Sequence, residues 1–264
     1  MAKAYLTIDD SPSTRMDDLV DFLSSKNIPA LFFCRGDELE KNPVAVIRAI
    51  QQGMVIGNHG YSHARASQIS VQDMIDEIDR TQKLIDNIYD MANFEKPGNF
   101  FRFPHMDRGC GSQILDFEAF DIKERNIVKA IFTEGLNTIS NKKLSDDEIK
   151  KKNDLQKFLK DRGYKTPFPD VNLPWYKNSA EIQNAADCFF TFSSADWMLT
   201  QRHLGKWRYQ SYDDLSQKIT ADQWLLKQNN TSIILMHDQS EIMDTVLDLL
   251  TFLDRCDLEF LEIK

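Results

Sequence analysis

The side chains best suited to chemistry are two adjacent aspartates and two histidines four positions apart. Asp9 and Asp10 directly follow one strand-like run, and His59 and His63 follow another. Two neighbouring carboxylates repel each other, which favours a site where one binds a cation and the other serves as a base. The spacing of four would place both imidazoles on one side of a helical turn. With Asp10 they would form a three-ligand set that leaves room for water, as catalytic zinc sites do.

Each of these motifs also has a plainer interpretation. An ordinary loop or helix start can carry Asp9 and Asp10. The chain has five histidines among its 264 residues, so one pair at this spacing can arise by chance. Neither motif therefore decides the function by itself.

Two further runs end in candidate side chains. His237 follows the apolar run 233–236 and is a candidate proton donor, although a lone histidine after a strand is often structural. Arg102 lies near the end of another strand-like run, and its planar guanidinium could orient a carboxylate. The alternative for Arg102 is a surface ion pair.

Short β-rich runs alternate with helical periods along the chain. Continuous apolar runs such as residues 233–236 are typical of strands buried on both faces by crossover helices. The pattern predicts a parallel barrel or an open α/β sheet. The expected strands are residues 4–8, 30–34, 54–56, 100–103, 188–192, 232–236 and 258–263, and helices are expected near residues 16–23, 43–50, 70–88, 211–227 and 240–253.

The candidate side chains all follow expected strands. Ligands bind at the carboxyl ends of the strands in parallel α/β folds. We therefore expect the two aspartates, the histidines and Arg102 to share one rim of the fold.

Residues from about 117 to 187 interrupt the alternation. They include a lysine-rich helical stretch at 141–160 and a proline-containing loop at 167–174. This predicts an insertion into a single domain that spans residues 1–264. The charged run 146–157 is most simply a solvated helix face, with a lid or an oligomer contact as the alternative.

The composition argues against several classes of partner. A formal net charge of −9 supplies no positive field for nucleic acid or anionic membranes. No run approaches the roughly 20 apolar residues that a membrane span needs. The start of the chain lacks a signal-peptide pattern, so we expect a cytoplasmic protein unless a secreted form has been trimmed. The four cysteines are scattered singly, which favours reduced thiols.

Five segments in order resemble the motifs of the polysaccharide deacetylases, carbohydrate esterase family four, also called the NodB-homology domain. No single motif is decisive, but their order matches throughout. The segments are Thr7 to Pro12, His59 with His63, Arg102 with Pro104, Asp196 with Trp197, and Leu235 with His237. The resemblance implies a distorted (β/α) barrel of about seven parallel strands with an inserted helical and loop segment.

The resemblance also implies a role for each matching residue. Asp9 would be the catalytic base, and Arg102 would orient it. His237 would be the general acid, supported by Asp196. The metal ligands would be Asp10, His59 and His63.

The remaining matches imply a substrate pocket. Trp197 and Leu235 would wall the acetyl pocket, next to Pro104, and the backbone N–H of His105 would help hold the oxyanion. Three positions depart from the family pattern, because Ser11 replaces Gly, His105 replaces an aromatic residue and Met106 replaces Gly. Ser11 would crowd the loop beside the metal, whereas His105, Met106 and the insertion would alter the substrate groove.

The resemblance thus predicts a metal-dependent carbohydrate N-deacetylase that acts on an amino sugar or an N-acetylated saccharide. Zn²⁺ is the expected metal, with Co²⁺ or Mn²⁺ as alternatives. The alternative functions are an amidase of the same fold acting on a non-sugar N-acyl substrate and a catalytically silent binding protein.

Overall fold

The strands of this protein form one parallel sheet. The computed structural model describes residues 1–111, 115, 117–133 and 143–264. Within them six strands follow the order β3-β2-β1-β5-β4, with β6 beside β1, and every pairing is parallel. This confirms the expected fold class. The strands are β1 (Ala2–Ser11), β2 (Ala30–Cys34), β3 (Val55–Asn58), β4 (Phe192–Ser193), β5 (Thr231–His237) and β6 (Leu258–Phe260).

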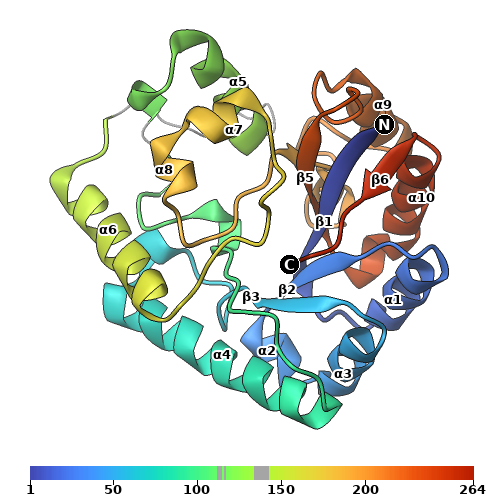
Figure 1. Ribbon diagram of the computed structural model, residues 1–264, viewed down its shortest axis with the longest axis horizontal. Helices are drawn as coiled ribbons and strands as arrows, with labels where there is room; N and C mark the ends of the chain where they lie inside the picture. The colour runs from blue at the N-terminus through green and yellow to red at the C-terminus, as the bar shows by residue number, and fades with distance from the viewer. Residues whose placement is uncertain (112–114, 116, 134–142) are drawn as a thin grey trace.

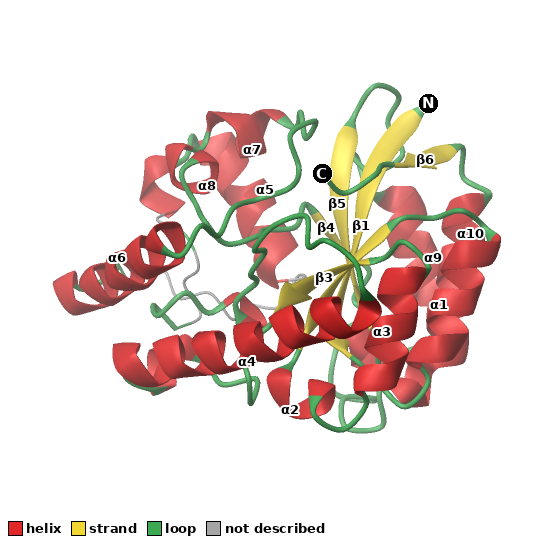
Figure 2. Ribbon diagram, turned by 60° about the horizontal axis from the view of Figure 1, so that its bottom comes forward, coloured by secondary structure: helices red, strands yellow, loops and turns green. Residues whose placement is uncertain are grey.

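Helices cover the strands from two sides. In both views α1, α3 and α10 lie on one side of the strands, and α5 to α8 lie on the other (Figure 1, Figure 2). The α-helices in the described residues are α1 (Met16–Ser25), α2 (Gly36–Leu39), α3 (Pro43–Gln51), α4 (Val71–Ala92), α5 (Ile122–Thr133), α6 (Asp146–Asp161), α7 (Pro174–Asn178), α8 (Ala180–Gln183), α9 (Tyr212–Ala221) and α10 (Met243–Asp254).

The alternation of side chains along β1 separates two apolar clusters. Leu6 and Ile8 pack in the cluster that contains buried residues of α1, α3 and α10. Tyr5 packs in the other cluster, with Phe33 of β2 and Ile233 of β5. Side chains on a strand alternate between faces. Asp9 therefore continues the face of Tyr5 at the carboxyl end of the strand.

The barrel closes irregularly between β3 and β5, where residues 100–103 and 188–192 were expected to form full strands. The first run makes a single parallel bridge between Asn58 and Phe101. The second run yields only the two-residue β4, although Cys188 N–H donates to Phe101 O at 2.7 Å. The guanidinium of Arg102 donates hydrogen bonds to the carbonyl oxygens of Cys188 and Phe189. In a regular sheet, these oxygens would accept from the backbone of a neighbouring strand.

Local signals explain where two helices begin and end. Ser70 caps α4 as expected, and it forms a reciprocal capping box with Asp73. The helix expected over 211–227 ends earlier, at Ala221. The carboxylate of Asp222 accepts the N–H groups of Trp224 and Leu225, which makes a turn that competes with the helix.

The lysine-rich stretch expected at 141–160 forms α6, and its residues 141 and 142 lie outside the described residues. Leu155 and Leu159 of α6 are fully buried in a cluster with Phe101 and Phe103. Lys150 and Lys157 are exposed, but Lys152 is buried, so only part of the helix is the solvated face that was expected. In the part of the chain that the structure describes, no helix is long and apolar enough to cross a membrane.

Candidate active site

The two aspartates at the end of β1 both face His59. Neighbouring strand residues normally point to opposite faces. Here Asp10 adopts a left-handed conformation with φ of 66°, and the pairing of β1 with β2 is irregular between Ile8 and Ser11. As a result Asp9 Oδ2 lies 3.6 Å from His59 Nε2, and Asp10 Oδ1 lies 3.8 Å from the same nitrogen.

The side chains of Asp10, His59 and His63 converge. Asp10 Oδ1 lies 3.1 Å from His63 Nε2, and one ligand atom from each of the three residues lies within 4.8 Å of the others. The histidines were expected on a helical turn, and that expectation is wrong. They follow β3 in a non-helical loop in which Gly60 and His63 have φ of 73° and 62°. This bend brings the two rings to a centroid distance of 5.1 Å.

The donor set of these three residues fits a divalent cation. Asp10 Oδ1 is buried and accepts no hydrogen bond from the described residues. His59 Nδ1 lies 2.8 Å from the carbonyl of Arg102, so this nitrogen carries the proton and Nε2 presents its lone pair toward Asp10. Burial lowers the pKa of His59 to about 4, so the imidazole is neutral at neutral pH. A bound cation would satisfy the carboxylate oxygen and the imidazole nitrogen that face one another here.

Asp9 is held by a fully buried arginine. Arg102 Nη1 donates to Asp9 Oδ1 at 2.7 Å and to Thr7 Oγ1 at 2.9 Å. Arg102 is 0% exposed, and its guanidinium lies 4.4 Å from the ring centroid of Phe33. The expected surface alternative, an exposed ion pair, is therefore wrong. One oxygen of Asp9 is fixed by Arg102, while the other faces the three-residue set.

His237 forms a second buried pair on the same rim. Its Nδ1 lies 2.8 Å from Asp196 Oδ1, and its backbone N–H donates to Asp196 Oδ2 at 2.8 Å. Ser194 Oγ also donates to Asp196 Oδ1. Burial by itself lowers the pKa of His237, but the carboxylate of Asp196 outweighs burial and raises the pKa to about 10. The ring is therefore charged at neutral pH and can donate a proton.

The loop after Arg102 places Pro104 and His105 beside the histidine pair. Pro104–Met106 forms a single 3₁₀ turn in which His105 and Met106 have φ of 54° and 53°. The ring of His105 lies 4.3 Å from that of His63, centroid to centroid. The sequence placed His105 in the substrate groove but did not predict this ring contact.

The two expected acetyl-pocket residues lie on neighbouring segments. Leu235 of β5 pairs with Ser193 of β4 and is nearly buried. Trp197 lies in the 3₁₀ turn Asp196–Leu199 and is half-buried. The ring centroids of His203 and Trp207 lie 4.9 Å and 5.9 Å from that of Trp197, which places an aromatic group beside the predicted pocket wall.

Sequence reasoning missed a residue that supports the histidine loop. The carboxylate of Glu77 in α4 accepts hydrogen bonds from the backbone N–H groups of Tyr61 and Ser62, at 2.8 Å and 2.6 Å. It also accepts one from the hydroxyl of Ser62 at 2.9 Å. Asn58 Oδ1 accepts the N–H of Gly60 at 2.9 Å. Glu77 resembles any exposed helix carboxylate in sequence, so only the fold reveals this contact.

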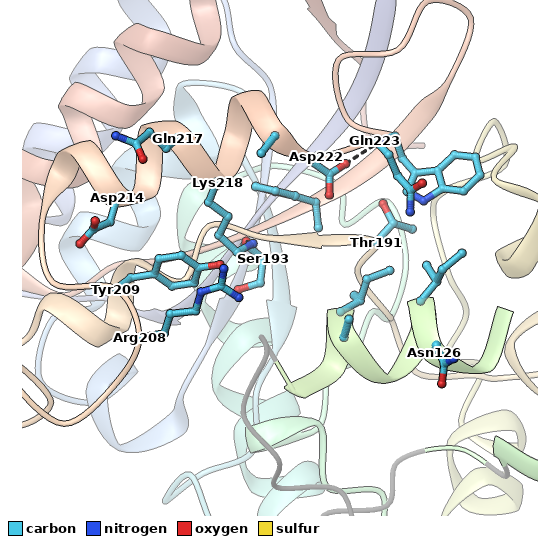
Figure 3. Close-up of a pocket in the computed structure, with 16 residues that line it drawn as sticks. Asn126, Thr191, Ser193, Arg208, Tyr209, Asp214, Gln217, Lys218, Asp222 and Gln223 are labelled. Carbon is cyan, nitrogen blue, oxygen red and sulfur yellow. Dashed lines mark hydrogen bonds between the residues drawn. The ribbon is translucent and has the colours of Figure 1, made fainter. Parts of the chain in front are cut away.

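A separate cavity of about 720 Å³ lies between α5, α9 and β4 (Figure 3). Arg208, Tyr209 and Lys218 line one part of it, and Thr191 lines another. None of the predicted site residues contributes to its lining. The cavity is therefore distinct from the rim that carries the aspartates and histidines.

Known proteins share parts of this sequence and its fold. Residues 2–109 match the family model described as polysaccharide deacetylase. A peptidoglycan-N-acetylglucosamine deacetylase of Bacillus cereus is 33% identical over 88 residues, which cover 33% of this chain and 32% of that protein. The chain thus spans about a third of the length of this curated relative.

Solved structures match over nearly the whole chain. The peptidoglycan deacetylase PdaC of Bacillus subtilis gives a TM-score of 0.55 at 16% identity, over 98% of this chain and 86% of that one. A family 4 carbohydrate esterase of Streptomyces lividans, in complex with acetate, gives 0.52 at 20% identity, over 97% and 90%. A family 4 pseudoenzyme of Bacillus anthracis gives 0.53 at 16% identity, over 97% and 62%. The chain therefore has the fold of the family 4 carbohydrate esterases, and its residues 2–109, less than half of its length, match the polysaccharide deacetylase family.

Proposed function

We propose that this protein is a metal-dependent hydrolase that removes the N-acetyl group of an amino sugar or of an N-acetylated saccharide. One observation carries the proposal. Three side chains that can bind a metal lie together on one rim. The same rim carries a carboxylate held by a buried arginine and a histidine kept charged by a buried aspartate. A base, an acid and a cation site are the three parts that amide hydrolysis needs.

The donor set supports zinc as the metal, with Co²⁺ or Mn²⁺ as alternatives, because mixed nitrogen and oxygen sites accept several such ions. Asp10, His59 and His63 would hold it. When bound, the cation supplies a Lewis acid that polarises the amide carbonyl and lowers the pKa of water.

The protein side chains would then move the protons. Asp9 takes a proton from the attacking water, and Arg102 keeps the other carboxylate oxygen in place. The water oxygen bonds to the carbonyl carbon, and the backbone N–H of His105 donates to the oxyanion. The C–N bond then breaks as His237 gives its proton to the departing nitrogen. The products are acetate and a free amine.

The substrate is proposed from the family, whose relative in Bacillus cereus is named for N-acetylglucosamine in peptidoglycan. An amidase acting on a non-sugar N-acyl compound is the second candidate. It is favoured by His105, which departs from the family motif and whose ring lies 4.3 Å, centroid to centroid, from that of His63. We further propose that residues 1–264 form a single domain with residues 117–187 as its insertion.

The test is acetate release from a panel of N-acetyl sugars, soluble chitin oligomers, peptidoglycan fragments and non-sugar N-acetyl amines. Activity should disappear when the protein is treated with a chelator, and it should return with Zn²⁺, Co²⁺ or Mn²⁺. Asp9→Asn serves as the inactive control. Full activity in protein shown by elemental analysis to be metal-free would overturn the proposal. Stable binding of the sugars without any acetate release would instead identify a silent binding protein.

A further inference from the structure

A buried ion pair that belongs to none of the predicted motifs lies behind the rim. Arg108 and Asp187 are 1% and 0% exposed. Arg108 Nε lies 3.0 Å from Asp187 Oδ2, and Arg108 Nη2 donates to Asp187 Oδ1 at 3.1 Å. The pair is thus a buried ion pair joined by one hydrogen bond, because Nε and Oδ2 make no hydrogen bond among the described residues.

On one side, the pair anchors the loop that carries His105. Arg108 lies three residues after His105, in a loop where His105 and Met106 are both left-handed. Such conformations are costly for residues other than glycine and persist only when their surroundings impose them. Asp107 adds to this anchoring, because its Oδ1 accepts the N–H of Gly109 at 3.0 Å.

On the other side, the pair anchors the carbonyls that hold Arg102. Cys188 O accepts from Arg102 Nε at 3.1 Å, and Phe189 O accepts from Arg102 Nη2 at 3.2 Å. These carbonyls belong to the two residues that directly follow Asp187. The short segment 187–189 therefore contacts Arg108 through the side chain of Asp187 and accepts hydrogen bonds from Arg102 through its backbone carbonyls.

The insertion supplies the outer contacts of the pair. Gln156 of α6 donates to Asp187 Oδ1 at 2.7 Å and accepts the N–H of Ala186 at 3.0 Å. Glu181 of α8 accepts from Arg108 Nη1 at 2.9 Å and also from Lys152 of α6. Both helices lie on the same side of the strands as α5 and α7 (Figure 1).

We propose that Asp187 is a positioning residue of the candidate active site. Through Arg108 it sets the loop that carries the backbone N–H of His105, and through the carbonyls of residues 188 and 189 it sets the guanidinium that orients Asp9. The inserted helices thereby stabilise the geometry of the catalytic rim. This inference rests on the proposed function.

The central variant is Asp187→Asn, which keeps the shape of the side chain and removes its charge. Asp161→Asn is the matched control, because it removes an exposed carboxylate that pairs with Lys157 within α6. For Asp187→Asn we expect kcat to fall about tenfold or more with KM nearly unchanged, because small displacements of catalytic groups slow the chemical step. Zinc affinity should stay unchanged, because the pair touches none of the three ligands.

Two measurements separate positioning from stability. The first is the pair of Arg Nε–H resonances of Arg102 and Arg108 in ¹H–¹⁵N spectra, identified with the Arg→Lys variants. Asp187→Asn should shift both resonances. The second is the double variant Arg108→Met/Asp187→Asn, which removes the buried guanidinium that Asp187→Asn leaves with Glu181 as its remaining carboxylate partner among the described residues. The double variant should recover thermal stability but keep the low kcat.

The proposal is overturned if the double variant recovers kcat together with stability, or if the Arg102 resonance does not move. Should Asp187→Asn fail to fold, Gln156→Ala provides the same readouts with a smaller effect, and an unchanged kcat and spectrum in that variant would also overturn it. Absence of acetate release by the unmodified protein would refute the proposed function alone, because the resonance test does not depend on activity.

Discussion

Asp9 and Asp10 have identical side chains but different surroundings. Asp9 gives one oxygen to the buried guanidinium of Arg102, whereas Asp10 leaves a buried oxygen without a hydrogen-bond donor among the described residues and close to two imidazoles. Surroundings of this kind, rather than residue type, separate a base from a ligand.

This difference predicts that metal retention and turnover separate in the two amide variants. Asp10→Asn should weaken metal binding, because a neutral amide replaces the anionic ligand. The fold should be retained, because Asn tolerates the left-handed backbone at this position. Asp9→Asn should retain the metal, while acetate release falls by about 10²–10⁴-fold, as expected for a lost general base. Elemental analysis and initial rates measure the two effects, with circular dichroism as the folding control. Metal loss in Asp9→Asn and full activity in Asp10→Asn would reverse the assignment.

The pair of His237 and Asp196 gives a prediction about pH. The pKa of His237 in the folded protein is about 10, above its ordinary value of 6.5. A raised pKa means that the stabilisation by the charged ring is complete below pH 6.5 and is lost as the pH rises toward 10. Asp196→Asn removes the carboxylate that raises the pKa. The difference in free energy of unfolding between the original protein and Asp196→Asn should therefore shrink over this range.

Urea denaturation of metal-free protein at a series of pH values measures that difference. A variant at an exposed carboxylate, Asp248→Asn, should show no such trend. A difference that grows as the pH rises would contradict the charged state assigned to His237.

At the scale of elements, α4 supports the loop that carries His63. Its Glu77 satisfies two consecutive N–H groups of a loop whose Gly60 and His63 are left-handed. Groups behind metal ligands commonly change metal affinity by about 10–100-fold when they are removed. We expect Glu77→Ala to weaken zinc binding by about tenfold, and Glu77→Gln to weaken it less because its carbonyl oxygen can still accept. Competition with a chromophoric chelator gives the affinities.

Asp76→Ala is the matched control for this element, because Asp76 lies beside Glu77 on the exposed side of α4 and bonds only to Gln72 among the contacts described. Equal zinc affinities in the Glu77 and Asp76 variants would show that α4 does not set the ligand geometry.

The sequence predicted the elements whose signals are local. The run 30–34 gives β2 with the expected bounds, and Ser70 caps α4. It did not predict elements that depend on distant partners. Residues 100–103 have strand propensity, but the buried guanidinium of Arg102 diverts the neighbouring carbonyls. Propensity is local, whereas this competition arises only in the folded chain.

The same distinction applies to the site. From spacing and motif order we expected Asp10, His59 and His63 on one rim, and the structure places them together. Their mutual geometry was predicted wrongly, because spacing favoured a helical turn where a loop with left-handed residues is found. Arg108 and Asp187 are 79 positions apart, and no local pattern links them.

For the whole molecule, the proposed insertion of residues 117–187 predicts the size of the substrate. Helices α5 to α8 cover one side of the strands (Figure 2). Glu181 of α8 contacts Arg108 in the loop that carries His105, and Gln156 of α6 contacts Asp187. We expect small soluble N-acetyl sugars to be better substrates than insoluble chitin or peptidoglycan, compared by acetate released per enzyme under equal conditions. Ready release from the insoluble polymers, with none from the small sugars, would contradict this expectation.

The position of β5 has a consequence for the order in which the protein is made. β1 pairs with β5 along Lys3 to Asp9, yet β5 begins only at Thr231. During synthesis, one edge of β1 therefore lacks its partner until residues 12–230 have also been made. An open strand edge is a template for pairing with other chains. The strand that closes this edge also carries His237, the proposed general acid, so the pairing of β5 with β1 covers the edge and brings His237 beside Asp9 in one event.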